Sequence, residues 1–200
     1  MSQKYTPASA LEDVFLQSIS AHNAVMRQVE MLEDLVQNAV ETCVDIIKND
    51  GKLLICGNGG SAADSQHFAA EIMGRFKKER RPWPAVALTT DSSILTAVGN
   101  DYGFDEIFAR QVEGIGRPGD ALIGISTSGN SPNIQNAVQT ARKMGIFTIG
   151  LLGGNGGAVA KEMDLPLIVK TQDTARIQEA HIFFIHYIAG GIEMRLMEKA

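Results

Sequence analysis

Cysteine and charge are both scarce in this chain of 200 residues. Only Cys43 and Cys56 are present, and their separation fits neither a disulfide framework nor a metal-binding spacing, so we expect two buried, reduced thiols. Charged residues make up 20% of the chain, and the net charge of −5 argues against an extended nucleic-acid-binding surface. A short basic run at 77–81 is interpreted as the solvated end of a helix.

Long hydrophobic runs are also missing. The most apolar stretch lies near residues 182–192, contains His186, and is too short to span a bilayer. Residues 1–7 lack the apolar core of a signal peptide. With 44% hydrophobic residues the chain can still bury a sizeable core, so the composition predicts a globular cytoplasmic protein with no membrane partner.

Glycine is missing from residues 8–49, and so are strand signals. Apolar side chains recur there at helical spacing, which predicts two helices that we expect to form an antiparallel pair. The apolar positions cover more than one face. We therefore expect residues 1–50 to pack against another subunit, and packing on the chain's own sheet is the alternative.

Alternating strand and helix patterns begin at residue 52. Strands are predicted at 52–57, 85–90, 120–126, 147–153 and 165–170. The predicted helices are 61–78, 92–98, 105–114, 131–144, 157–162 and 174–198. This order predicts one α/β domain over residues 51–200, a doubly wound, flavodoxin-like sheet of five parallel strands.

Two polar loops, 56–61 and 126–131, each follow a buried strand and precede a helix. Such a turn points backbone N–H groups at one spot, which attracts a phosphate. Residues 57–62 also fit the dinucleotide pattern G-x-G-x-x-A, but the acidic residue that such a site needs lies too far along the chain, at Asp91. A small phosphorylated molecule is therefore favoured over a nicotinamide cofactor.

The second loop is the more specific of the two. Four hydroxyl residues lie within six positions, namely Ser126, Thr127, Ser128 and Ser131. Pro132 fits the first position of a helix with Ser131 as its N-cap. Capping explains Ser131 alone, whereas hydroxyl donors beside helix N–H groups suit a phosphate monoester.

Two further segments carry candidate catalytic side chains. His67 and Glu71 are four residues apart and lie on one face of the helix after the first loop, where a pair can bind a metal or transfer a proton. Their neighbours are apolar, so we expect this helix to be largely buried. The last helix places Gln178, His181 and His186 in an apolar stretch, and His181 is equally well explained as a core or interface histidine.

Taken together, these segments resemble the bacterial phosphoheptose isomerases, which are sugar-isomerase (SIS) domain enzymes. The matching segments are Gly57-Asn58-Gly59-Gly60-Ser61, His67-Phe68-Ala69-Ala70-Glu71, Gly99-Asn100-Asp101, Gly124 to Ser131, and Arg176-Ile177-Gln178-Glu179 with His181 and His186. The resemblance covers nearly the whole chain. It implies isomerisation of sedoheptulose 7-phosphate to D-glycero-D-manno-heptose 7-phosphate for lipopolysaccharide synthesis, by homotetramers with active sites between subunits.

The resemblance also implies a role for each matching residue. Glu71 and His186 would be the acid–base pair. The phosphate would be held by Ser126, Thr127, Ser128 and Ser131, and the sugar would be contacted by Asn58, Gly59, Gly60, Ser61, Glu71, Asn100, Asp101 and Gln178. Zinc, one per subunit, would be bound by His67, Glu71, Gln178 and His186. One departure is Ala175, where some family enzymes have an acidic residue.

Helix geometry adds a constraint on this set. Gln178 and His186 are eight residues apart, so their backbones are separated by about 12 Å along one helix and rotated by about 80°. We therefore expect part of the site to be completed across a subunit interface. Two alternatives stay open: a non-catalytic SIS protein that binds a sugar phosphate or the replication initiator protein, and an isomerase of another phosphorylated sugar. The presence of both Glu71 and His186 favours an enzyme.

Overall fold

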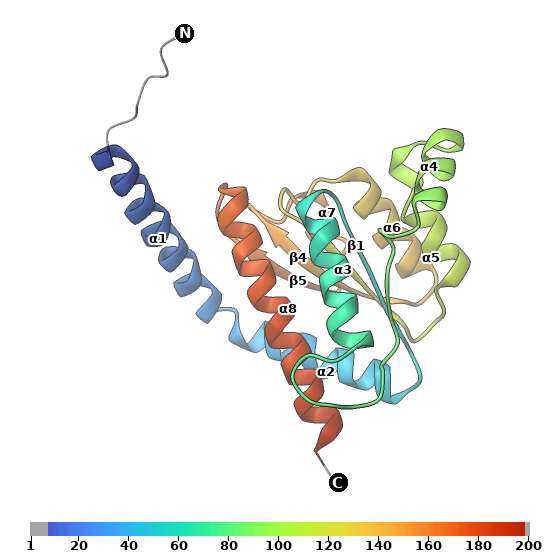
Figure 1. Ribbon diagram of the computed structural model, residues 1–200. Helices are drawn as coiled ribbons and strands as arrows, with labels where there is room; N and C mark the ends of the chain where they lie inside the picture. Colours follow the sequence, from blue (N-terminus) through green and yellow to red (C-terminus); the bar gives the residue numbers. More distant parts are fainter. Residues whose placement is uncertain (1–7, 199–200) are drawn as a thin grey trace.

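The computed structural model describes residues 8–198 and has a parallel five-stranded sheet between two layers of helices (Figure 1). The strands are β1 (Leu53–Gly57), β2 (Ala85–Ala87), β3 (Ala121–Ser126), β4 (Phe147–Gly153) and β5 (Leu165–Val169). Their order in the sheet is β2-β1-β3-β4-β5, which confirms the predicted doubly wound, flavodoxin-like fold. The segment at 1–7, where no signal peptide is predicted, lies outside the described residues.

Two hydrophobic cores lie on opposite faces of the sheet. Alternate side chains of β1 point to opposite sides: Leu53 and Ile55 join one core, and Leu54 and Cys56 join the other. The first core is covered by α2 (Glu33–Lys48), α3 (Gly60–Met73) and α8 (Thr174–Met197). The second is covered by α4 (Ser92–Asp101), α5 (Ala109–Ile115), α6 (Pro132–Lys143) and α7 (Gly157–Ala160), and the short helix η1 (Phe104–Glu106) lies between α4 and α5 in the chain. Burial on both faces explains why the strands are continuous apolar runs.

The helix after β1 is shorter than the sequence predicts. It ends at Met73 and not at residue 78. The backbone N–H groups of Phe76, Lys77 and Lys78 donate to the carboxylate of Glu193 on α8, so they do not continue the helical hydrogen bonds. A distant side chain therefore decides where this helix stops. β2 is also shorter than predicted, since only Ala85–Ala87 pairs regularly with β1.

The two N-terminal helices do not form the antiparallel pair that the periodicity predicts. The C-terminal turns of α1 (Ala8–Glu30) bury Val25 and Val29 in the first core, its N-terminal half projects away from the sheet, and α2 turns beneath the sheet, as Figure 1 shows in blue. α2 buries Val40, Cys43 and Val44 in the core of its own chain, whereas Leu11 and Phe15 on α1 remain more than half exposed. The reason for the difference is that α8 and the sheet offer α2 an apolar surface, which competes with pairing between the helices.

Both cysteines are buried, as the sequence predicts. Burial raises the pKa of Cys43 and of Cys56 to about 12, so both stay protonated thiols at neutral pH. None of the helices within residues 8–198 combines the length and the hydrophobicity that a membrane span requires.

Candidate active site

The two predicted ligand loops lie side by side at the carboxyl edge of the sheet. β1 and β3 are neighbours, and the helices that follow them, α3 and α6, cover opposite faces. In a doubly wound sheet such a divergence opens a crevice between the two loops. The side chains of Asn58 in the first loop and Asn133 in the first turn of α6 are joined by two reciprocal hydrogen bonds of 2.8 and 2.9 Å.

The first loop is shaped by glycine. Gly59 has a φ of +56°, in the left-handed region where a β-carbon is unfavourable, and α3 begins at the next residue. At Gly60 an added β-carbon would collide with the side-chain amide of Gln178. Gln178 thus lies against the first turn of α3, while Ser61 is almost completely buried behind the loop.

The second loop brings three of its hydroxyl groups together. The Oγ atom of Ser126 lies 3.0 Å from that of Ser131 and 3.5 Å from that of Ser128. Ser131 occupies the N-cap position of α6 with Pro132 as the first helical residue, as predicted, but its side chain makes no capping hydrogen bond. Its hydroxyl faces the other serines instead and is available to a ligand. Thr127 is half-buried beside them.

Three catalytic candidates from distant parts of the sequence form one cluster. The Nε2 atom of His67 lies 3.1 Å from Oε1 of Glu71 and 3.1 Å from Nε2 of His186. One potential ligand atom from each of the three residues lies within 4.8 Å of the others. The cluster forms because α3 packs against α8, and all three residues come from one chain, so the expectation of a site completed by a second subunit is wrong for these residues.

The cluster is more accessible than the sequence predicts. The side chain of Glu71 is 21% exposed and that of His67 is 43% exposed. Of the apolar neighbours, Ala70 and Met73 are exposed, so the expectation of a largely buried α3 is wrong for this face. The helix packs on β1 and β2 and against α8 through Phe68, Ala69 and Ile72, while His67 and Ala70 are exposed.

The remaining predicted residues lie apart from this cluster. Asn100 and Asp101 end α4, are exposed, and are joined to each other by a hydrogen bond of 2.8 Å from Nδ2 to Oδ1. Ala175 lies in the first turn of α8, where its N–H donates to Asp173 at 3.0 Å. The helix start is therefore capped by an acidic residue two positions before Ala175.

Asp64 is a neighbour of the cluster that the sequence analysis missed. Within the described part of the chain its Oδ2 atom is buried without a hydrogen-bond partner. Burial raises the pKa of the Asp64 carboxyl, and the nearby His67 opposes that shift. A search for acidic residues three or four positions before His67 would have found it.

Known proteins with similar sequences belong to one family. The SIS domain family model matches residues 17–153. The phosphoheptose isomerase of Campylobacter concisus is 51% identical over 183 residues, which are 92% of this chain and 97% of that protein. That of Citrifermentans bemidjiense is 55% identical over 182 residues, 90% of this chain and 95% of that protein. The chain belongs to the phosphoheptose isomerase family.

Solved structures of phosphoheptose isomerases have the same fold. The one from Neisseria gonorrhoeae superposes with a TM-score of 0.85 at 45% identity and covers 94% of this chain and 100% of its own. The one from Francisella tularensis gives 0.87 at 38% identity, over 95% of this chain and 100% of its own. The resemblance inferred from the sequence motifs is confirmed.

An aromatic ring and a buried ion pair near the cluster were not predicted from the sequence. Phe76 stacks on the ring of His186, with the ring centroids 5.6 Å apart. The side chains of Arg80 and Glu193 are only 3% and 2% exposed and form an ion pair at 3.1 Å. The interpretation of 77–81 as a solvated helix end is therefore wrong for Arg80. Glu193, a charged residue among apolar neighbours on α8, is the feature of the sequence that could have indicated this ion pair.

Proposed function

We propose that this chain interconverts sedoheptulose 7-phosphate and D-glycero-D-manno-heptose 7-phosphate, at the start of the route to the heptose of lipopolysaccharide. The single observation that carries the proposal is the juxtaposition of a carboxylate and an imidazole, Glu71 and His186, whose potential ligand atoms lie within 4.8 Å. Ketose–aldose conversion needs such a pair, because one proton moves between carbons and another between oxygens.

The serine loop supplies the anchor for the substrate phosphate. The hydroxyls of Ser126, Ser128 and Ser131 converge beside the N-terminus of α6, where the helix dipole favours an anion. Thr127 would add a fourth hydroxyl. Binding energy from this remote group positions the reacting carbons at the other end of the sugar.

The reaction divides between the two catalytic residues. Glu71 would remove the proton from C1 of the ketose, which leaves an enediol, and return it to C2 on the same side of the sugar. His186 would take the proton of the C1 hydroxyl and deliver one to the oxygen at C2, since imidazole both accepts and donates near neutral pH. Each proton that is removed is matched by one that is returned, and the net result is that the carbonyl group moves from C2 to C1.

The first loop and neighbouring residues would orient the sugar chain. The candidate contacts are Asn58, Gly59, Gly60, Ser61, Asn100, Asp101 and Gln178. No atom stands within 4 Å of the place where a β-carbon of Gly59 would lie, so a ligand can approach the backbone there, and Asn58 is already held in place by Asn133. The buried position of Ser61 makes it the weakest of these candidates.

Zinc fits the cluster on chemical grounds. Two imidazoles and a carboxylate are a common ligand set of catalytic zinc, and His67, Glu71 and His186 present these groups within 4.8 Å. The metal, when bound, would polarise the substrate carbonyl and stabilise negative charge on its oxygen. Gln178 is the fourth ligand predicted from the family, and this role stays a prediction, since its amide lies beside Gly60.

Assembly into a homotetramer is part of the proposal. It is supported by the exposed apolar side chains of α1 and by a cavity of about 920 Å³ between α2 and α8 that reaches His186. A second chain could cover both and add groups to the site. The cytoplasmic location predicted from the sequence stays a prediction.

A direct assay tests the function. We expect the purified protein to convert sedoheptulose 7-phosphate into the aldose, followed by the sugar resonances in NMR, with faster turnover after addition of zinc. Sedoheptulose without the phosphate should react far more slowly. An unchanged spectrum with and without zinc would refute the proposal and favour a SIS protein that only binds its ligand.

A further inference from the structure

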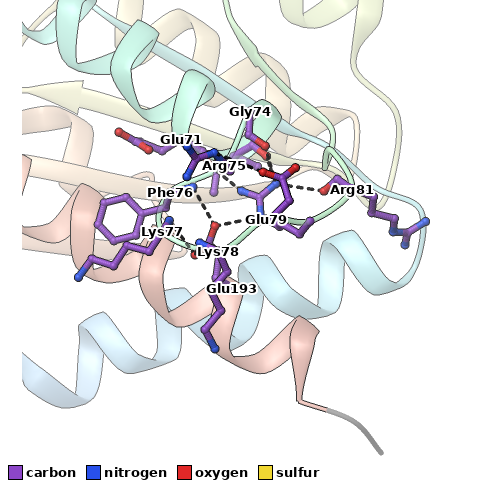
Figure 2. A network of polar contacts seen from close by, with 11 residues as sticks. Glu71, Gly74, Arg75, Phe76, Lys77, Lys78, Glu79, Arg81 and Glu193 are labelled. Carbon is purple, nitrogen blue, oxygen red and sulfur yellow. Dashed lines mark hydrogen bonds and ion pairs between the residues drawn. The ribbon is translucent and has the colours of Figure 1, made fainter.

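A buried ion pair lies behind the catalytic cluster, in the loop that follows α3 (Figure 2). Glu193 points from α8 into this loop and accepts four hydrogen bonds. Its Oε1 atom accepts from the backbone N–H of Phe76 at 2.8 Å and from Nε of Arg80 at 3.1 Å. Its Oε2 atom accepts from the backbone N–H groups of Lys77 and Lys78, both at 3.0 Å.

The carboxylate of Glu193 is held in its charged form. Burial by itself would raise the pKa of this group, but the three backbone donors and the charge of Arg80 outweigh burial and lower it. A buried carboxylate with every contact satisfied is a rigid anchor, because breaking any of these contacts leaves an unpaired polar group.

Arg80 connects the carboxylate of Glu193 to the end of α3. Its Nη2 atom donates to the backbone carbonyl of Glu71 at 2.7 Å, and its Nη1 atom donates to those of Ile72 and Gly74 at 2.9 and 3.1 Å. The last carbonyls of a helix have no partners within the helix, and a cation there also complements the helix dipole. The guanidinium is flanked by the ring of Trp83, 3.8 Å from the ring centroid.

Glu193 is also connected to His186, the second catalytic residue. Glu193 follows His186 by seven residues, so the two lie on nearly the same face of α8, about 10 Å apart along its axis. Phe76, whose N–H is bound by Glu193, stacks on the imidazole of His186. One carboxylate thus restrains the backbone of Glu71 through Arg80 and the ring of His186 through Phe76.

From these contacts we infer that Glu193 and Arg80 are positioning residues, which set the distance between the carboxylate of Glu71 and the imidazole of His186. Neither is assigned contact with the substrate. The inference rests on the proposed isomerase function. It predicts that weakening the ion pair lowers the rate of the chemical step and leaves the phosphate anchor, which is built on β3 and α6, unchanged.

Asp120 offers a matched control at the opposite edge of the sheet. It is also a buried carboxylate, accepts from the backbone N–H groups of Lys52 and Arg117 at 2.9 and 2.8 Å, and pairs with the Lys52 ammonium. It lies at the start of β3, whereas the catalytic cluster lies beyond the carboxyl ends of the strands. Loss of its charge should weaken the fold without moving the cluster.

The test compares Glu193→Gln with Asp120→Asn in the full chain, by kcat and KM for sedoheptulose 7-phosphate and by urea unfolding. We expect both variants to unfold at lower urea. Only Glu193→Gln should lower kcat, by about 10- to 100-fold with KM within about threefold of the wild type, because a misplacement of about 1 Å is that costly. If Glu193→Gln does not fold, Arg80→Lys replaces it, since a lysine cannot make the forked contacts of the guanidinium.

Two results would overturn the inference while the wild type remains active. One is a kcat lowered equally in the Glu193 and Asp120 variants, and the other is an unchanged kcat in the Glu193 variant, whether or not KM rises. An inactive wild type would instead refute the proposed function, so the two failures are distinguishable.

Discussion

At the scale of single residues, Glu71 has the most specific proposed role. Glu71→Gln keeps the size of the side chain and its place on α3 but removes the base. We expect kcat to fall by about 100- to 10,000-fold, the usual contribution of a positioned general base. Binding of the sugar phosphate, measured by calorimetry, should stay within a few-fold of the wild type. A variant with nearly normal turnover would show that another group removes the carbon-bound proton.

Ser128 has the complementary role, since its hydroxyl is exposed and converges with that of Ser126. We expect Ser128→Ala to raise KM by about tenfold with little change in kcat, because one hydrogen bond to a charged group contributes about 1.5 kcal/mol. Steady-state kinetics distinguish the two parameters. A lowered kcat at constant KM would place this serine near the reacting carbons and not at the phosphate.

At the scale of elements, the junction between β1 and α3 depends on one backbone conformation. An added β-carbon at Gly59 would meet no atom within 4 Å, so the only cost of Gly59→Ala is its φ of +56°. Because Gly59 combines this φ with a ψ of −120°, a rarely populated region for other residues, we expect a loss of about 1–3 kcal/mol in the free energy of unfolding. Gly114→Ala, equally uncrowded but inside α5, is the control and should stabilise the protein by up to about 1 kcal/mol. Equal effects in urea unfolding would contradict this account.

At the scale of the whole molecule, the free energy of unfolding should depend on pH because α8 buries a histidine. The ring of His181 is completely buried, and this burial lowers its pKa from 6.5 to about 4, although the backbone of Leu152 opposes part of the shift. In this window the unfolded chain binds a proton that the native protein does not. Stability should therefore fall as the pH is lowered from 6.5 to 4, by roughly 3 kcal/mol.

His181→Leu removes this titration and nearly preserves volume, so its urea midpoint should depend less on pH between 6.5 and 4 than that of the wild type. Parallel pH profiles for the two proteins would mean that the histidine titrates alike in the folded and unfolded states, and would contradict its burial as a neutral ring.

The assembly is also tested at this scale. Leu11 and Phe15 lie four residues apart on α1 and are 61% and 63% exposed in the single chain. If a second chain covers them, Leu11→Glu combined with Phe15→Glu should lower the mass measured by analytical ultracentrifugation, because burial of two charges opposes association. Gln17→Glu, an added charge at an exposed polar position, should leave the mass unchanged. A wild type that sediments as a monomer would contradict the proposed homotetramer.

The sequence by itself determined the sheet and the two ligand loops. Short apolar runs such as 53–56 and 121–125 can be buried on both faces only in a parallel sheet, and the glycines and serines that follow them restrict the backbone locally. His67 and Glu71 share a helix face by spacing alone. These features depend on neighbours within a few residues, which is why they can be read directly from the chain.

Only the tertiary structure decided how the helices end and pack. The stop of α3 at Met73 and the burial of Arg80 both depend on Glu193, more than a hundred residues away, and the turn of α2 beneath the sheet depends on α8. The contact between His67 and His186 likewise depends on the packing of α3 against α8. Such contacts follow from which surfaces compete for burial in the folded chain, and no local pattern of residues encodes that competition.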